Sequence, residues 1–232
     1  MLVQVIVLTS IWRKSIKSSK KEIGLVKNHL YNNKLNSKNM AEEKKFTGYG
    51  TCTFANGEYT GELVDGVRQG YGVLRFSNYD MYDGDWEAGK MHGKGKYKFY
   101  DPCKDKYASV YEGDFNHGVR EGKGKMKYSN YDVYVGTWQN DKRTGNGICW
   151  FGNGNVFQGI WKFDLMVRGV FRKANGEVYD GEIKNGTYNG YGKLFWSNSK
   201  WFEGFFVDGK PYKGMLFSID GKISEYKDGK QL

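Results

Sequence analysis

Aromatic residues and glycines alternate with polar residues along most of this chain, with a period of two. Between 82 and 99, for example, Tyr82, Gly84 and Trp86 stand two residues apart, and the second half of the stretch continues the alternation. Residues two apart share one face of an extended strand. Dipeptides that favour tight hairpin turns separate such runs, as at Asp65-Gly66, Asn185-Gly186 and Asp208-Gly209. The pattern therefore predicts a series of β-hairpins.

The hairpins are copies of one unit. Its leading aromatic recurs with spacings of 23, 29, 23, 23, 22 and 23 residues, a glycine follows two residues later, and three units add a tryptophan. A fixed period in this range marks a repeat architecture, in which each unit buries its apolar face against its neighbours. The expected repeat core is Tyr59, Gly61, Tyr82, Gly84, Trp86, Tyr111, Gly113, Tyr134, Gly136, Trp138, Phe157, Gly159, Trp161, Tyr179, Gly181, Phe202 and Gly204.

Glycine is a poor strand residue, so its regular place in both strands needs a reason. Without a side chain there, the ring of an adjacent unit can lie flat on the backbone, and no second layer is needed. The predicted fold is all-β, an elongated, single-layer, twisted antiparallel sheet of tandem β-hairpins. We place the repeat domain at residues 46–232, with about seven to eight repeats, an irregular insertion at 100–109 and a C-terminal cap at 211–232.

Residues 1–45 differ in composition and are predicted to be a disordered or helical basic extension. Of the net charge of +10, +7 lies before Met40, and Gly24 is the one glycine in that part. An apolar run precedes the basic residues, which is the reverse of a secretory signal. One interpretation is an amphipathic segment that touches anionic lipid. The other, which we prefer, is that Met40 is the working start.

Charged residues occupy the opposite face of the strands, with acidic groups on first strands and basic groups on second strands. Paired across strands, such charges contribute about 0.2–1 kcal/mol each at best. We favour this role for the lysine runs, and the alternative is a binding site for anionic phospholipid at Lys94, Lys96, Lys98, Lys123, Lys125 and Lys127. The repeat body carries only +3, which argues against a nucleic-acid partner.

The pattern offers no catalytic, cofactor or metal site. Cys52 and Cys149 occupy core positions of the repeat and are expected to be small packing residues. His29, His92 and His117 lie in the leader or in turns, far apart in repeat register, without the spacing of a triad or a metal site. Each Gly-x-Gly pair is followed by an aromatic strand, unlike a nucleotide-binding loop. We therefore predict that the protein is not an enzyme and binds no cofactor.

The stretch Tyr-Asp-Gly-Asp-Trp-Glu-Ala-Gly-Lys-Met-His-Gly-Lys-Gly at 82–95, with its six relatives, resembles the MORN repeat, a glycine- and aromatic-rich motif of 23 residues. The resemblance covers about 48–229. It implies a non-catalytic scaffold with protein partners, located in the cytoplasm and placed in ciliary, sperm, acrosomal, vesicular or cytoskeletal assemblies.

The sequence is compatible with three functions. The leading hypothesis is a protein-binding scaffold, which includes a homodimer formed end to end or by edge association. The alternative is a peripheral protein that tethers or binds anionic membranes through the lysine runs. Carbohydrate binding by the aromatic residues is disfavoured because the sequence lacks the Trp-Tyr pairs and secretory signal of such repeats.

Overall fold

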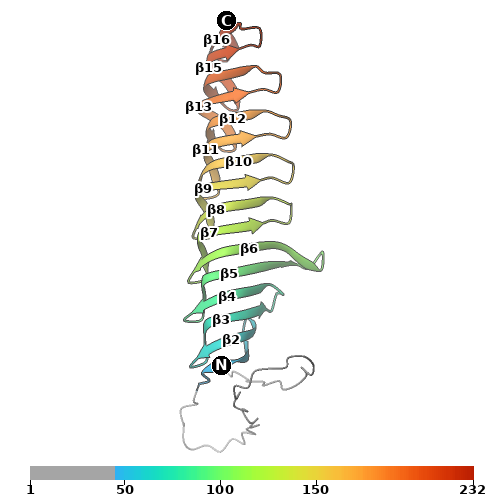
Figure 1. Cartoon of the computed structure of the whole chain (residues 1–232), viewed down its shortest axis with the longest axis vertical. Coiled ribbons are helices and arrows are strands. Elements are labelled where there is room, and N and C mark those ends of the chain that lie inside the picture. The colour runs from blue at the N-terminus through green and yellow to red at the C-terminus, as the bar shows by residue number, and fades with distance from the viewer. Residues whose placement is uncertain (1–44) are drawn as a thin grey trace, which may run out of the picture.

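Residues 45–232, which are the part of the chain described by the computed structural model, form one antiparallel sheet of 17 strands (Figure 1). Each strand pairs with the strands before and after it in sequence. The strands are β1 Gly48–Phe54, β2 Gly57–Val64, β3 Val67–Phe76, β4 Met81–Glu87, β5 Lys90–Asp101, β6 Lys106–Asn116, β7 Val119–Lys127, β8 Val133–Gln139, β9 Lys142–Trp150, β10 Val156–Lys162, β11 Leu165–Arg172, β12 Val178–Lys184, β13 Thr187–Phe195, β14 Trp201–Val207, β15 Lys210–Phe217, β16 Ile223–Lys227 and β17 Lys230–Gln231. The predicted all-β sheet of tandem hairpins is confirmed. Expectations for residues 1–44 lie outside the described residues.

Two-residue turns join the strands of each hairpin, as the dipeptides predicted. Asp65 and Gly66 have φ of 49° and 75°, and Asn185 and Gly186 repeat this with 51° and 76°. Positive φ at both positions defines the turn whose twist matches paired strands. Asn140-Asp141 and Phe163-Asp164 adopt the same conformation without glycine, so the turn is a property of the repeat and not of one dipeptide.

Each leading aromatic is fully buried and lies over the glycine pair of its own hairpin. Gly84 and Gly95 are opposite each other on β4 and β5, and a Cβ atom at Gly95 would come within 2.6 Å of Cζ of Tyr82. This corrects the expectation that the ring of an adjacent unit would cover the glycines. A ring in the same hairpin reaches them because Tyr82 and Gly84 share one face of β4.

Contacts between units come from the second aromatic position. Trp86 packs edge-on against Tyr82 of its own unit, with ring centroids 5.1 Å apart, and against Tyr59 of the preceding unit at 5.3 Å. Its indole N–H donates to the carbonyl of Gly72, 3.0 Å away. Trp138 and Trp161 make the equivalent contacts. Each unit is therefore held mainly by its neighbours.

A β-bulge follows the glycine pair and receives the tyrosine hydroxyl. Tyr134 donates to the carbonyl of Thr137 at 3.1 Å, and the four other leading tyrosines bond in the same way to the residue three positions on. Burial raises the pKa of Tyr134 to about 12, which keeps the hydroxyl a donor. The two units that begin with phenylalanine, at Phe157 and Phe202, have bulges with fewer unpaired residues. The presence of the hydroxyl therefore correlates with the longer bulge.

Replacing Phe157 by tyrosine is expected to lower the free energy of unfolding by about 2 kcal/mol, because the shorter bulge leaves the new buried hydroxyl without a partner. Urea denaturation measures the change. As a control, Tyr111→Phe, which removes one existing bond to Asp114, should cost about 1 kcal/mol. Wild-type stability of the Phe157→Tyr protein would show that the bulge length does not select the ring.

The insertion at 100–109 is mainly β-strand, with a β-bulge between Phe99 and Tyr100 and a turn at 102–105. It extends β5 and β6 by further pairs, Tyr100 with Tyr107 and Asp101 with Lys106, and Figure 1 shows this hairpin projecting beyond the others. Cys103 is exposed at its tip, whereas Cys52 and Cys149 are buried in the core. Burial raises the pKa of the Cys149 thiol to about 11, which suits a packing residue.

In the last hairpin, other residue types occupy the repeat positions. Ser224 stands where a leading aromatic would be, and the ring of Tyr226 covers Phe202 with centroids 5.5 Å apart. Residues 45–232 contain no helix of the length and apolarity that a membrane crossing requires.

Candidate functional site

The face of the sheet opposite the buried rings, termed the open face, carries the side chains that alternate with the core residues. Over β4–β7 these side chains are charged, as predicted, and most paired groups lie across strands. Lys94 pairs with Asp114, and Lys96 lies 3.1 Å from Glu112. The Lys94 ammonium and the Lys123 backbone N–H hold the pKa of Asp114 below its usual value, against the effect of burial. Two of the six candidate lipid-binding lysines are thus partly neutralised.

The remaining lysines of that set are exposed, except for the half-buried Lys98. Lys98 lies over the Tyr107 ring, 5.5 Å from its centroid, and Lys123 donates to the hydroxyl of Thr137 at 2.8 Å. Lys125 and Lys127 are exposed on β7. The six lysines share the open face, but they do not converge on one point, as they follow two strands separated by acidic residues of β6.

A shallow groove of about 740 Å³ runs along this charged part of the open face. Its floor is the line of paired glycines, and Lys94, Lys96 and Glu112 are among its walls. A second groove of about 510 Å³ continues the line across β8–β11, and there the walls include Val135, Ile148 and Val170. The chemistry of the open face therefore changes along the sheet.

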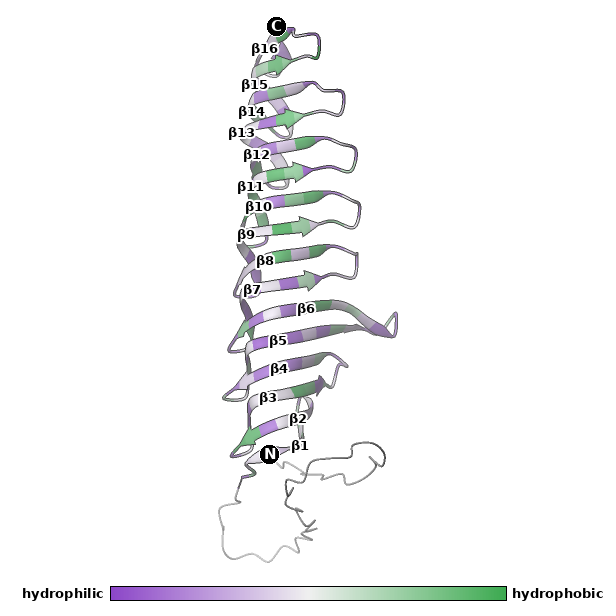
Figure 2. Ribbon diagram, viewed as in Figure 1, coloured by the Kyte–Doolittle hydropathy of each residue, from purple (hydrophilic) through white to green (hydrophobic). Residues whose placement is uncertain are grey.

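From β8 onward, apolar side chains replace many of the charges. Val135, Trp150 and Ile160 stand at positions where earlier units carry acidic or basic residues, and each is at least 40% exposed. Figure 2 shows the change as mainly purple ribbon over β4–β7 and more green from β8. Neighbouring apolar groups exposed on one face are typical of a surface that binds another molecule.

Exposed aromatic rings gather on β13–β15. Trp201 stacks on Phe217, with centroids 3.8 Å apart, and on Phe195 at 5.9 Å. Phe205, which is 52% exposed, lies against Tyr191 at 5.5 Å. We term Tyr191, Phe195, Trp201, Phe205 and Phe217 the aromatic cluster. Its central ion pair, Lys193 with Glu203 at 3.1 Å, provides polar contacts among the rings.

The repeat pattern predicts neither the exposed apolar residues Val135, Trp150 and Ile160 nor the aromatic cluster, because it specifies the core residues and the alternating charges. The signal is present in the repeat register. The residue directly after the first glycine of the unit is Asp85 or Asp114 in early units. In later units it is Ile160 or Phe205. Aligning the outward positions of all units would have shown the change.

The histidines also differ from expectation. His92 and His117 were placed far apart, but their rings meet with centroids 5.0 Å apart. The reason is that His92 lies near the start of the second strand of one hairpin, while His117 lies in the turn of the next. Stacking of hairpins brings these places together, and Glu87 lies beside both.

Comparison with known proteins identifies the repeats. The MORN repeat model matches residues 42–58, 59–81, 82–101, 111–133, 134–156, 157–178 and 179–200, which together are more than half of the chain. Six of the matches begin at a leading aromatic. The Phe202 unit has no match, although Gly204 and Gly214 pair there as in the other hairpins. A comparison with curated proteins finds no match.

Three solved structures are distantly similar. The G-box domain of the microcephaly protein CPAP has 13% identity and a TM-score of 0.43, covering 80% of this chain and 97% of its own. The TCP10 domain of Danio rerio CPAP, bound to a STIL peptide, has 12% identity and a TM-score of 0.39. The match covers 80% of this chain and 92% of that domain. The SAS-4 TCP domain of Drosophila melanogaster, bound to a proline-rich motif of Ana2, has 10% identity and a TM-score of 0.36. The match covers 84% of this chain and 97% of that domain.

Similarity at this level carries no functional information, and the repeat matches are the informative result. Their number, their coverage and their agreement with the observed hairpins show that the chain belongs to the MORN-repeat family.

Proposed function

We propose that the protein is a scaffold that binds a protein partner along the open face of β8–β16. The observation that carries this proposal is the exposed apolar surface made by the aromatic cluster and the apolar stretch before it. A partner segment with an apolar stripe would bury these rings, while polar groups beside them, such as Lys193 and Glu203, would fix its position.

The family supports this assignment, since MORN repeats form non-catalytic scaffolds. Within the family, the spacer at 100–109 and the stretch from 201 to 208 resemble MORN repeat-containing protein 3. This resemblance supports a cytoplasmic location in a sperm, acrosomal, ciliary or cytoskeletal assembly. Localising the tagged protein in germ cells and ciliated cells tests that part.

The test of partner binding uses Ile160→Asp combined with Phe205→Asp. Asp85 and Asp114 occupy the same repeat position, so the fold accommodates aspartate there, and the cross-strand neighbours Arg168 and Lys213 are basic. The wild-type chain and the variant are used for affinity capture with cross-linking from native cells. We expect the variant to lose a reproducible partner by more than about thirtyfold, as for a lost hot spot.

The matched control is Lys125→Asp combined with Lys127→Asp, which changes two residues in the charged half of the same face. It should retain the partner, and cross-links should map to β8–β16. Equal capture by both variants would contradict the proposal. If the captured species is a second copy of this chain, light scattering of the purified protein will show a dimer that the aspartate variant lacks.

The membrane alternative gives a different outcome. It requires co-sedimentation with vesicles that contain anionic lipid, decreasing with salt and abolished by the lysine variant. The ion pairs of Lys94 and Lys96 with acidic residues of β6 weaken this alternative, because part of the positive charge is already neutralised within the sheet.

A further inference from the structure

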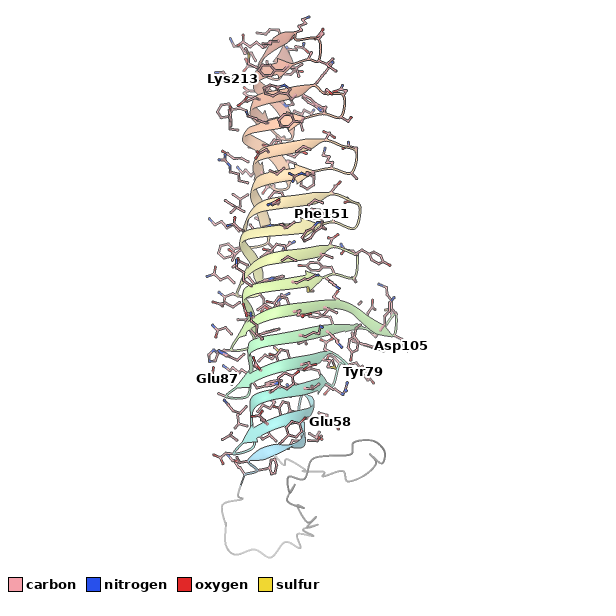
Figure 3. All side chains as sticks on the ribbon, in the orientation of Figure 1. Glu58, Tyr79, Glu87, Asp105, Phe151 and Lys213 are labelled. Carbon is pink, nitrogen blue, oxygen red and sulfur yellow. The ribbon has the colours of Figure 1, made fainter. Side chains whose placement is uncertain are left out.

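Three potential metal ligands meet at the edge of the sheet that carries the two-residue turns. Glu87 ends β4, His92 is the third residue of β5, and His117 lies in the turn between β6 and β7. Figure 3 labels Glu87 at this edge, opposite the edge with Tyr79 and Asp105. Two of the ligands thus come from one hairpin and the third from the next.

The distances suit a small tetrahedral ion. Oε2 of Glu87 lies 3.3 Å from Nδ1 of His92 and 3.7 Å from Nε2 of His117, and all three ligand atoms lie within 4.8 Å of one another. Around zinc, with bonds of 2.0–2.2 Å, tetrahedral ligand atoms are separated by about 3.3 Å. A small movement of the exposed His117 ring would complete this geometry.

The hydrogen bonding of both histidines leaves a nitrogen available. Nδ1 of His92 is buried, and in residues 45–232 it makes no hydrogen bond of good geometry, although Oε2 of Glu87 lies 3.3 Å away. Nδ1 of His117 lies 2.6 Å from Oδ1 of Asn116. Donation from that nitrogen to the amide oxygen leaves Nε2 with its lone pair toward Glu87. Such an outer bond commonly orients a metal-binding histidine.

The backbone around the cluster is fixed by the repeat. The N–H of Gly118 donates to the carbonyl of Met91 at 2.8 Å, and the same bond between neighbouring hairpins recurs at Gly89 with Arg68 and at Asp164 with Arg143. The two turns are therefore adjacent in the same way as all others in the stack. What distinguishes this place is the identity of the three side chains, because no other group of three such ligands was found in residues 45–232.

We propose that Glu87, His92 and His117 bind Zn²⁺, with water at the fourth position. Two imidazoles and one carboxylate are a known zinc ligand set, whereas Mg²⁺ and Ca²⁺ require mainly oxygen ligands. The bound ion links two consecutive hairpins beside the long β5–β6 hairpin. Since the cluster is exposed, the water position is open to a ligand from another molecule.

The test uses the full chain after treatment with a chelator. Equilibrium dialysis should give one Zn²⁺ per chain, and Co²⁺ should give the visible absorption of a four-coordinate site, which zinc then displaces. His92→Gln and His117→Asn should each weaken binding by more than about tenfold, because each removes a ligand, and loss of a residue that only orients a ligand already costs about that much.

Asparagine at 117 tolerates the positive φ of that turn position, so the variant is expected to fold. Glu87→Gln provides a second variant of unchanged shape, and His29→Gln is the matched control because it removes the third histidine of the chain from outside the described residues. Binding without a fixed stoichiometry, or an equal loss in the His29→Gln protein, would overturn the proposal. Unchanged binding by His92→Gln and His117→Asn would do so as well.

Discussion

Replacing Tyr134 by alanine is expected to lower the free energy of unfolding by about 4 kcal/mol, as for other large aromatic residues in a core. The ring is fully buried, covers Gly136 and Gly147, and packs edge-on against Trp138 and Trp161 at 5.3 Å. In a single-layer sheet no second layer can move in to fill the cavity. Urea denaturation followed by tryptophan fluorescence measures the loss, since two indoles border the ring.

Tyr134→Phe separates the hydroxyl from the ring. It keeps the aromatic contacts and removes only the hydrogen bond to Thr137, so we expect a loss of about 1 kcal/mol. Hydrogen exchange should show that the alanine variant loses protection mainly in β7–β10, the strands of this unit and its neighbours. If alanine and phenylalanine proved equally stable, the buried ring would not be what joins the units.

Replacing Gly147 by valine is expected to destabilise the protein by about 3 kcal/mol, although valine is the better strand residue. Removing glycine from a strand gains roughly 0.5–1 kcal/mol. However, a Cβ atom there would lie 2.6 Å from Cε2 and Cζ of Tyr134, so the ring must leave its place, and overpacking of a core costs about 1–3 kcal/mol or more. The steric cost is therefore larger than the gain in propensity.

Asn146→Val is the matched control, because Asn146 precedes Gly147 on β9 and points to the open face, where it lines a groove. The stability of that variant should remain within about 0.5 kcal/mol of the wild type. Thermal and urea unfolding of both proteins decide the matter. A Gly147→Val protein as stable as Asn146→Val would mean that the glycine is dispensable.

The architecture could be predicted from sequence because each unit repeats the same local signals. Leading aromatics, glycines and turn dipeptides recur in phase, and strands paired with their sequence neighbours need no long-range information. Which glycines each ring covers is harder to predict from the sequence. Whether Tyr82 covers its own glycines or those of the next unit depends on the tilt of the side chain, which the alternation of residues does not specify.

The site features were missed for a different reason. The aromatic cluster and the histidine cluster depend on side chains that single units carry at outward positions, so they do not recur with the period. Phe195, Trp201 and Phe217 are separated along the chain and follow no simple repeat pattern. The antiparallel register nevertheless places Trp201 beside both Phe195 and Phe217. Glu87 and His117 likewise meet only because neighbouring turns stack.

The pairing of each strand with its sequence neighbours also has a consequence for the evolution of length. A duplicated hairpin, spliced in at a unit boundary, would present the same aromatic rings to both flanking copies and would lengthen the molecule by about 9.5 Å, two strand spacings. The distance between the His92–His117 pair and the aromatic cluster can therefore change only by whole hairpins, while the two surfaces themselves stay unchanged.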